Sequence, residues 1–413
     1  MGLEPLDAAP LLLDGISGGA GAVVDSLVEA GHEAVLVGGC VRDLLQGRPP
    51  ADFDVATSAP AEASLGLFPR AIPIGLRHGT IMIPTDDGPV DVTCFRGASL
   101  AEDLAHRDFT VNAIAYDPRT RRLIDPHGGR ADLAKGRLRA VGSAAARFAE
   151  DPLRAVRAAR LQATLGLDVD PEVESAMNTV IEPLRAVARE RVRVELSRLL
   201  VGPGAGTALA LLRRSGIEAD LAPGVAEDAA RVIPRLPPRL DLRLAGWLRG
   251  ARSTRILRRL RFPRRTTEQV ERLLRGHPVE AGVDPTREAS LRRQLKRVGL
   301  TQVDGLVALR RAELEVGSPQ DGTDPVEAAV LLDRFAAAVE RLQQASSLAL
   351  QRQDLALDGA AVMEILGVPP GPAVGRALRR LTDRILDDPS LNTPSGLRAL
   401  LESWGDEDGS QPA

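Results

Sequence analysis

The stretches Leu36-Val-Gly-Gly-Cys-Val-Arg-Asp43 and Ala51-Asp-Phe-Asp-Val-Ala-Thr57 decide the fold of the first part of this chain. Each contains a short apolar run that predicts a strand, and the first run enters a Gly-Gly turn that opens a short helix. Asp52 and Asp54 stand two residues apart, so on a strand their carboxylates point to the same face. Glycines let backbone N–H groups approach phosphate oxygens closely, and paired carboxylates hold divalent metal. Together the two stretches predict metal-assisted chemistry on a nucleoside triphosphate.

Length and composition bound the class of protein. The chain has 413 residues, 44% hydrophobic and only 2% aromatic, so we expect roughly two to four domains with cores of Leu, Ala and Val. The net charge of -3 excludes a strongly basic RNA-coating protein, and any nucleic-acid site must be a local basic patch. Cys40 and Cys94 form no disulfide framework and no metal spacing, which favours a reducing, cytoplasmic setting. No apolar run reaches about 18 residues and no signal-peptide pattern opens the chain, so no membrane association is expected.

The order of predicted elements gives a mixed α/β region followed by helices. Strands are expected at 33–37, 52–56 and 71–75, and a β-hairpin at 80–95 around Thr85-Asp-Asp-Gly88. After about residue 145 the Leu, Ala and Arg content favours helices. The expected helices are 41–45, 61–68, 147–165, 190–200, 207–214, 240–249, 254–260, 267–275, 325–348, 358–366 and 372–386, with breaks at Gly202-Pro-Gly204, 276–285 and 317–325.

The Gly-Gly turn and the paired aspartates form the first constellation. Arg42, one turn into the helix after Gly38 and Gly39, can reach a phosphate. The alternative is a solvent-exposed strand end with a tight turn, since a bare Asp-x-Asp is common. The full Gly-Gly-x-Val-Arg-Asp spacing ahead of Asp-x-Asp favours the functional interpretation.

A two-metal site requires a third carboxylate on a neighbouring strand, and Asp91 is the candidate. In the run 90–95, Val90 and Val92 face one side of the sheet while Asp91 and Thr93 face the other. Asp91 reaches the site if the hairpin lies beside the strand that carries Asp54. The alternative is a hairpin charge that faces water.

The third constellation is Arg107, Asp108 and Asn112, at the start of an apolar segment that predicts a helix. One interpretation makes Asp108 the N-cap of this helix. The other gives Arg107 a phosphate or ribose contact and lets Asp108 and Asn112 hold the sugar hydroxyls. The two interpretations are compatible, and both stay open.

The fourth constellation is a charged stripe at three-residue spacing within the predicted helix 147–165. It consists of Asp151, Arg154, Arg157 and Arg160. For an isolated helix the default interpretation is an i,i+3 ion-pair ladder on a wet surface.

These four motifs together resemble the class II tRNA nucleotidyltransferases, that is, the bacterial-type CCA-adding enzymes and their poly(A) polymerase relatives. The strong motifs lie between about residues 33 and 200. Further stretches continue the resemblance, at 125–133, 189–195 and, more loosely, 358–392.

The resemblance implies an α+β fold, with a nucleotidyltransferase palm on a mixed β-sheet followed by an all-helical neck, body and tail. The tail is the expected tRNA-binding part. Arg-dense stretches such as 252–265 and 292–297 can track the phosphate backbone of tRNA, and the alternative for each of them is a solvated helical surface, so none is named as a site. The expected boundaries are a flexible N-terminus at 1–20, the palm at 21–145, the neck at 146–202, the body at 203–316, the tail at 317–404 and a flexible C-terminus at 405–413.

The resemblance also implies the roles of the residues above. Asp52, Asp54 and Asp91 would be the catalytic residues and would bind two magnesium ions (Mg2+). The nucleotide would be bound by Gly38, Gly39, Arg42, Arg107, Asp108, Asn112, Asp151, Arg154, Arg157 and Arg160, with Gly39, Arg42 and Arg107 on the triphosphate.

Asp151 and Arg154 would read the base. A carboxylate only accepts hydrogen bonds and a guanidinium only donates them. Cytosine and adenine present an amino donor beside a ring-nitrogen acceptor, while uracil and guanine present the reverse. The pair therefore suits C and A and opposes U and G.

One departure from the family pattern concerns the terminal A. Relatives that add it carry a longer, flexible loop between the motif ending at Arg96 and Asp108, whereas here only 97–107 intervene. The short link resembles the CC-adding subgroup, whose partners are the tRNA acceptor and T arm and CTP, and whose product goes to a separate A-adding enzyme. The alternatives are a full CCA-adding enzyme that also uses ATP, a poly(A) polymerase, and a catalytically inactive RNA-binding protein.

Overall fold

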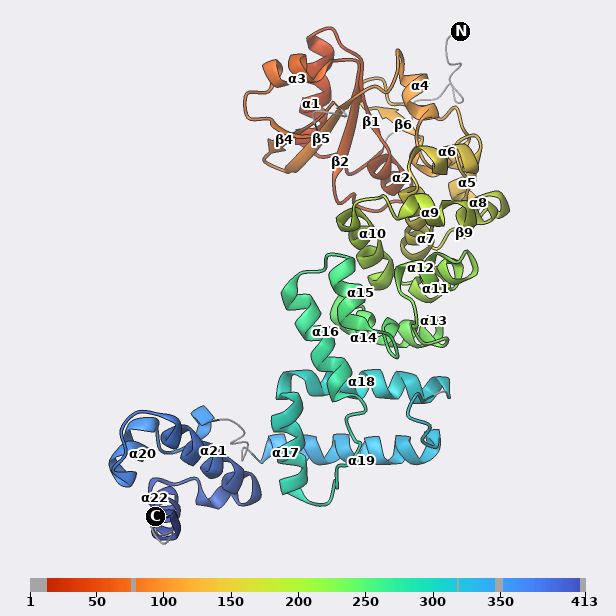
Figure 1. Cartoon of the computed structure of the whole chain (residues 1–413). Coiled ribbons are helices and arrows are strands. Elements are labelled where there is room, and N and C mark those ends of the chain that lie inside the picture. Colours follow the sequence, from red (N-terminus) through yellow and green to blue (C-terminus); the bar gives the residue numbers. More distant parts are fainter. Residues whose placement is uncertain (1–12, 76–78, 318, 346–351, 409–413) are drawn as a thin grey trace. The chain divides into compact units, whose positions relative to one another are not determined.

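The computed structural model describes residues 13–75, 79–317, 319–345 and 352–408. The chain divides into two compact units, Met1–Pro223 and Gly224–Ala413, which are followed by colour along the ribbon in Figure 1. Each unit has its own packed interior. The predicted α+β class is confirmed, since strands dominate the first part of the chain and helices the rest.

A seven-stranded mixed sheet, in the order β3-β4-β5-β2-β1-β6-β7, forms the base of the first unit. The pair β2 and β5 is parallel and its neighbours are antiparallel, so the predicted mixed sheet and the β4–β5 hairpin are both present. The parallel pair places Asp54 directly opposite Asp91. The strands are β1 (Ala34–Val37), β2 (Phe53–Thr57), β3 (Ile72–Gly75), β4 (Thr80–Thr85), β5 (Gly88–Cys94), β6 (Ala115–Asp117) and β7 (Arg122–Ile124).

Alternation along the strands fills both faces of this sheet. Leu36 and Val55 join one hydrophobic cluster with Val24 and Leu27 of helix α1 (Gly18–Glu29). The intervening strand residues pack on the other face against helix α4 (Leu100–Ala105). Because successive side chains of a strand point to opposite faces, the central strands need apolar residues at nearly every position, as they have.

Helices of 129–221 complete the first unit around α7, whose small residues are fully buried. The predicted single helix 147–165 is wrong, because the chain leaves the helical conformation at Asp151, which is extended (φ -145°, ψ 102°) ahead of Pro152. A proline disfavours the helical conformation in the residue before it. The helices are α2 (Gly39–Leu45), α3 (Ala61–Leu67), α5 (Gly129–Ala134), α6 (Ala144–Glu150), α7 (Leu153–Leu165), α8 (Pro171–Met177), α9 (Ile181–Leu184), α10 (Arg189–Val201), α11 (Ala205–Arg214) and α12 (Ile217–Leu221).

The break at 202–204 is a close contact inside the first unit. The Gly204 N–H donates to the Ala163 carbonyl at 2.8 Å, and a Cβ on Gly202 would lie 2.8 Å from the same oxygen. Glycine at these positions lets α11 pack directly on α7. The boundary between the units therefore falls after Pro223, inside the predicted body of 203–316, rather than at 202.

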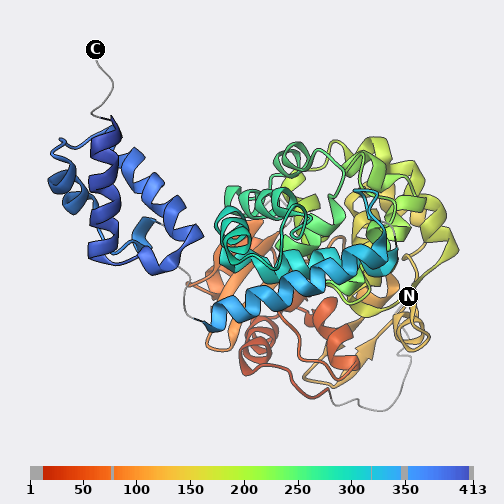
Figure 2. The ribbon, with the colours of Figure 1, turned by 90° about the horizontal axis from the view of Figure 1, so that it is seen from below.

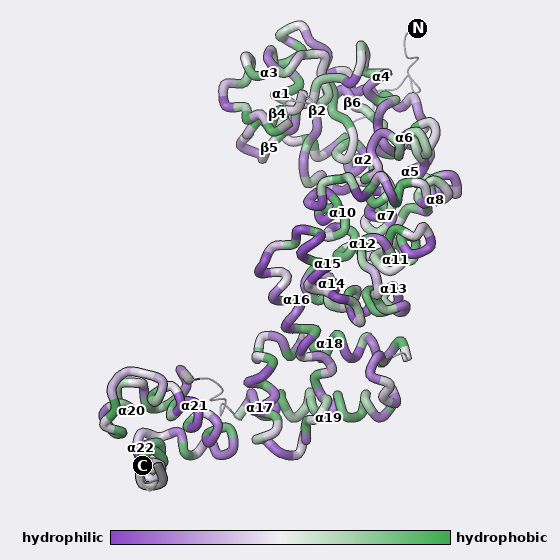
Figure 3. The backbone as a smooth tube through the Cα atoms, viewed as in Figure 1, coloured by the Kyte–Doolittle hydropathy of each residue, from purple (hydrophilic) through white to green (hydrophobic). Residues whose placement is uncertain are grey.

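The second unit is all helical. Hydrophilic residues run through most of α16 (Figure 3), while Val270 and Leu273 turn inward. Its helices are α13 (Ala229–Val232), α14 (Leu240–Trp247), α15 (Ser253–Arg259), α16 (Arg264–Gly276), α17 (Glu288–Val298), α18 (Leu300–Val316), α19 (Pro325–Gln344), α20 (Gly359–Leu366), α21 (Pro372–Asp387) and α22 (Pro394–Asp408).

Several predicted ends differ from the structure. α19 is one uninterrupted helix (Figure 2) that ends at Gln344, and residues 346–348 of its predicted extension lie outside the described residues. α22 continues to Asp408, so residues 405–408 of the predicted flexible C-terminus are helical. At the other end, Leu13 is buried and α1 begins at Gly18, so the predicted flexible segment 1–20 ends too late; residues 1–12 and 409–413 are not described.

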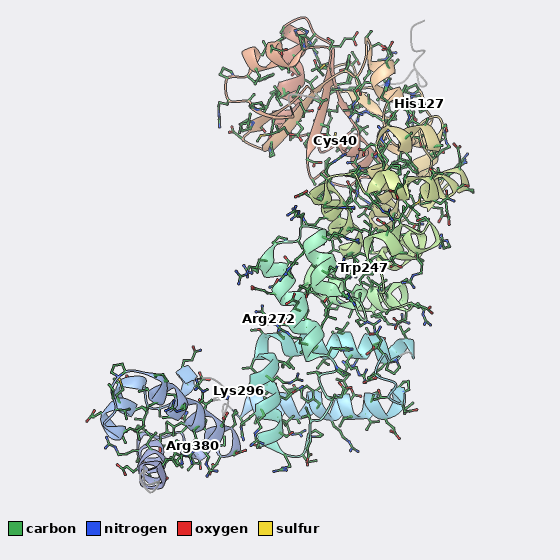
Figure 4. The ribbon with its side chains drawn as sticks, in the orientation of Figure 1. Cys40, His127, Trp247, Arg272, Lys296 and Arg380 are labelled. Carbon is green, nitrogen blue, oxygen red and sulfur yellow. The ribbon has the colours of Figure 1, made fainter. Side chains whose placement is uncertain are left out.

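Buried charges cross-link the second unit beside the fully buried Trp247 (Figure 4). The Glu313 carboxylate accepts from Arg249 Nη1 and Arg310 Nη1 at 2.8 Å and contacts His277 Nε2 at 2.9 Å. Burial alone raises the pKa of Glu313, but the hydrogen bonds to His277, Arg310 and the Gln320 N–H outweigh it and lower the pKa to about 2. Glu313 therefore joins α18 to the ends of α14 and α16 as an ionised group.

We expect Glu313→Gln to lower the free energy of unfolding by about 3 kcal/mol at pH 7, because it leaves two buried guanidinium groups short of a countercharge. The pKa of Glu313 in the folded protein lies below its ordinary value of 4.5. The difference in free energy of unfolding between wild type and variant is therefore full above pH 4.5 and is lost as pH falls toward 2. Urea unfolding followed by tryptophan fluorescence measures it, since Trp247 and Trp404 both lie in this unit.

Glu315→Gln is the matched control. Glu315 lies on α18 like Glu313, and among the described residues it forms only an exposed ion pair, with Arg235. Such pairs contribute at most about 1 kcal/mol. Equal losses in the two variants would contradict the structural importance of the buried cluster.

Candidate active site

A cavity of about 450 Å³ in the first unit gathers polar side chains from distant parts of the chain. All the predicted nucleotide-binding residues line it, and so do Asp52 and Asp54. Asp91 does not, although it lies opposite Asp54 in the sheet. The lining residues are Gly38, Gly39, Arg42, Asp52, Asp54, Arg96, Arg107, Asp108, Asn112, Asp151, Arg154, Arg157, Arg160, Arg191 and Arg198.

The turn at Gly38 shapes one wall. Gly38 has a φ of +76°, and a Cβ there would lie 2.9 Å from Arg107 Nη1 and 3.6 Å from Asp54 Oδ2. Glycine thus permits both the left-handed backbone and the approach of a cation and a carboxylate. Behind the turn, Cys40 (Figure 4) is buried, and burial raises the pKa of its thiol to about 12. Cys40 is therefore a packing residue rather than a nucleophile.

The three aspartates lie close enough to repel one another. Asp52 directly precedes β2 rather than lying on it, and Asp54 is on the strand. Burial, followed by the charges of Asp52 and Asp91, raises the pKa of Asp54 to about 6 against the opposing charge of Arg107. Burial and then Asp52 likewise raise the pKa of Asp91.

A divalent cation would relieve this repulsion, and carboxylate oxygens are the ligands that hard cations prefer. Within 13–75, 79–317, 319–345 and 352–408, no three Asp, Glu, His or Cys side chains converge closely enough to hold an ion. The aspartates fit a metal by charge and ligand type, although their side chains do not converge on one point in the described structure.

Asp108 anchors a hydrogen-bonded chain toward Arg42. Its carboxylate accepts from the Phe109 N–H at 2.8 Å and from Asn112 Nδ2 at 3.1 Å, and Asn112 Oδ1 accepts from Arg42 Nη1 at 2.5 Å. The predicted helix after Asp108 is wrong, because Phe109 forms an isolated bridge with Ala140 and only a 3-10 turn follows at Thr110–Asn112. Asp108 is accordingly not a helix N-cap.

Arg157 joins the sheet region to α7 and α10. Its guanidinium contacts Asp108 Oδ2 at 3.1 Å and Glu195 Oε1 at 3.2 Å, and Arg160 Nε donates to Glu195 Oε2 at 2.6 Å. Burial raises the pKa of Asp108, but the charge of Arg157 and the hydrogen bonds from Asn112 and Phe109 lower it to about 2. The Asp108 charge in turn raises the pKa of Arg157.

Asp151 and Arg154 are not paired with each other. Arg154 donates to Glu150 Oε2 at 2.8 Å and to the carbonyls of Arg147 and His106 at 3.0 Å. Asp151 instead pairs with Arg191 at 2.6 Å. The i,i+3 ladder on a wet surface is therefore absent from this helix, whose charged stripe lines the cavity.

Sequence reasoning missed Glu195, Arg96, Arg191 and Arg198. Three of them lie on one helix, α10, at four- and three-residue spacing, which places them on one side. That spacing was visible in the stretch after 189, but nothing in it indicates which distant helix it faces.

Known proteins share this arrangement. The profile described as the poly A polymerase head domain matches residues 34–139, and the profile described as a probable RNA and SrmB-binding site of polymerase A matches 166–228. A CCA-adding enzyme of Geobacillus stearothermophilus is 34% identical over 406 residues, covering 92% of this chain and 95% of that protein.

The chain belongs to the family of bacterial CCA-adding enzymes. It is thus a tRNA nucleotidyltransferase, as the motifs predict. A crystal structure of the Bacillus stearothermophilus CCA-adding enzyme in complex with CTP has a TM-score of 0.76 at 32% identity, covering 94% of this chain and 98% of that one. The CC-adding tRNA nucleotidyltransferase of Shouchella clausii is 44% identical over 193 residues, which is 47% of this chain and about half, 51%, of that protein.

Among the described residues, no helix has the length and apolarity needed to cross a bilayer. With a nearly neutral net charge, a nucleic-acid site was expected to be a local basic patch, and the excess of arginine around the cavity is such a patch.

We expect Gly38→Ala to slow nucleotide incorporation into tRNA at least tenfold, because its methyl group displaces Arg107 from Asp54. Gly31→Ala is the control, since Gly31 has a similar φ of +86° but open space around its Cβ position. Both variants should lose about 1–2 kcal/mol of stability from the left-handed backbone. Equal incorporation rates in the two variants would argue against the role of the Gly38 contact.

Proposed function

We propose that this protein adds two cytidine monophosphates from CTP to the 3′ end of tRNA and leaves the terminal A to another enzyme. The observation that carries the proposal is the compact link between β5 and Arg107. Only residues 95–99 separate β5 from α4, and Ala98 N donates to Glu102 Oε2 at 2.8 Å while Arg96 N donates to Asp103 Oδ1 at 3.2 Å. The link is closed by its own hydrogen bonds and has no room for a long flexible loop.

The sequence relatives support both versions of the activity. A CC-adding enzyme is 44% identical to this chain over 193 residues. A full CCA-adding enzyme is the second candidate, because a relative of that name matches nearly the whole chain. The missing loop favours the first candidate.

In this proposal Asp52, Asp54 and Asp91 hold two magnesium ions, which when bound lower the pKa of the attacking 3′-hydroxyl and neutralise the leaving pyrophosphate. Arg42 and Arg107 bind the triphosphate together with the N–H groups of the turn at Gly38 and Gly39.

Asp108 and Asn112 contact the sugar with the hydrogen-bonding capacity that Arg157 and Arg42 leave free. Arg157 and Arg160, fixed by Glu195, form the floor of the cavity.

Asp151 and Arg154 select the base in this proposal. Arg154, held by Glu150 and two carbonyls, donates to the ring nitrogen, and Asp151 accepts from the amino group. A uracil would leave both groups unsatisfied, at about 1–3 kcal/mol each.

The nucleotide requirement tests the proposal. A tRNA transcript lacking its CCA end, incubated with enzyme, Mg2+ and CTP, should lengthen by two nucleotides on a sequencing gel. Addition of ATP should leave that product unchanged. Efficient conversion to a CCA end would contradict the CC-only specificity and favour the full CCA-adding activity.

Asp54→Asn should reduce CMP incorporation at least a thousandfold and at the same time raise the thermal midpoint. The variant loses a metal ligand but also removes a carboxylate whose ionisation is opposed by burial and by Asp52. Asp86→Asn, in the exposed β4–β5 turn, is the control and should change neither quantity. Near wild-type turnover of the Asp54 variant would refute the metal-site assignment.

A further inference from the structure

Two contacts set the direction of the Asp151 carboxylate. Its Oδ1 accepts from the Leu153 N–H at 3.1 Å, and its Oδ2 accepts from Arg191 Nη2 at 2.6 Å. The first contact comes from Leu153, the first residue of α7, two residues further along the chain. The second comes from α10, forty residues further along the chain.

Arg154 needs no such support. It donates three hydrogen bonds, to Glu150 and to the carbonyls of Arg147 and His106, and its side chain is only 11% exposed. The Asp151 side chain is 29% exposed, and Arg191 is its one ion-pair partner among the described residues. The two base-reading groups are thus held in unequal ways.

We propose that Arg191 is a positioning residue that sets base selectivity through Asp151, an inference that rests on the proposed reading of the base by Asp151 and Arg154. A carboxylate oxygen has two lone pairs. With one lone pair of each oxygen occupied by Leu153 and Arg191, the carboxylate is held in one orientation with the remaining lone pairs free for an amino group.

Without Arg191 the carboxylate rotates, and the discrimination against a carbonyl in place of the amino group falls. The ion pair contributes through orientation, because its exposed partner is screened by solvent and adds little stability. The Arg191 side chain itself is 54% exposed.

Selectivity, measured as the ratio of kcat/KM for CTP to that for UTP, tests the proposal. Arg191→Gln should lower this ratio on the order of tenfold, the loss falling on CTP with UTP nearly unchanged. Arg191→Lys should restore part of the ratio, because an ammonium keeps one donor but not the planar fork. Arg189→Gln, on the same helix but outside the cavity, is the control and should match wild type.

A double-mutant cycle with Asp151→Ala separates action through Asp151 from a direct contact. Asp151→Ala alone should lower the ratio, and adding Arg191→Gln to it should lower it no further. An equal loss of kcat/KM for CTP and UTP in Arg191→Gln would overturn the proposal in favour of a phosphate or RNA contact.

Failure of the underlying function is distinguishable from failure of this inference. A wild-type enzyme that incorporates no CMP would refute the proposed function itself. A wild-type enzyme that selects CTP, with a ratio that Asp151→Ala leaves unchanged, would refute the base-reading role of Asp151 and with it the role of Arg191. Thermal midpoints of all variants within about 2 °C of wild type show that selectivity is not lost through unfolding.

Discussion

The ion pairs of Arg157 with Asp108 and Glu195 are the constraint on which the cavity depends. They tie the segment after the sheet to α7 and α10, and both carboxylates are almost fully buried. The Arg157 side chain itself is 43% exposed, so solvent screens these pairs in part, yet its removal would leave two buried carboxylates without this countercharge. The same pairs fix Arg157 and Arg160, and through Asn112 they also fix Arg42. The geometry of the cavity therefore depends on the Arg157 guanidinium as well as on the sheet.

The charge balance of the cavity follows from this arrangement. Eight arginines and four aspartates line it, so positive charge is concentrated there although the whole chain carries -3. Asp108 forms an ion pair with Arg157, and Asp151 forms one with Arg191. Asp52 and Asp54 have no comparable ion pair in the described structure. A triphosphate with its metal ions carries the complementary pattern, since the phosphates suit the arginines and the cations suit the free carboxylates.

Local patterns allowed the sequence to predict the turn at Gly38, the strand carrying Asp54 and the hairpin carrying Asp91. Each depends on residues within about ten positions, where periodicity and turn chemistry act. The errors came from contacts distant in sequence. The helix expected after Asp108 is absent because Phe109 bridges to Ala140, and the domain break expected at Gly202 is a close contact with Ala163. The partners Glu195 and Arg191 were missed for the same reason, because the residue pattern of a helix does not indicate which distant element the helix packs against.

Hydrogen bonding at the base does not by itself explain a preference for cytidine over adenosine. Both bases offer an amino donor beside a ring-nitrogen acceptor, so Asp151 and Arg154 would accept either one. The difference that remains is size, and a purine needs more depth than a pyrimidine. Arg154 is held by Glu150 and two backbone carbonyls, and α4 is joined to β5 by a short, internally bonded link. In the proposed function, a cavity whose walls are fixed in this way would select by volume, and a longer loop would be needed to admit the larger base.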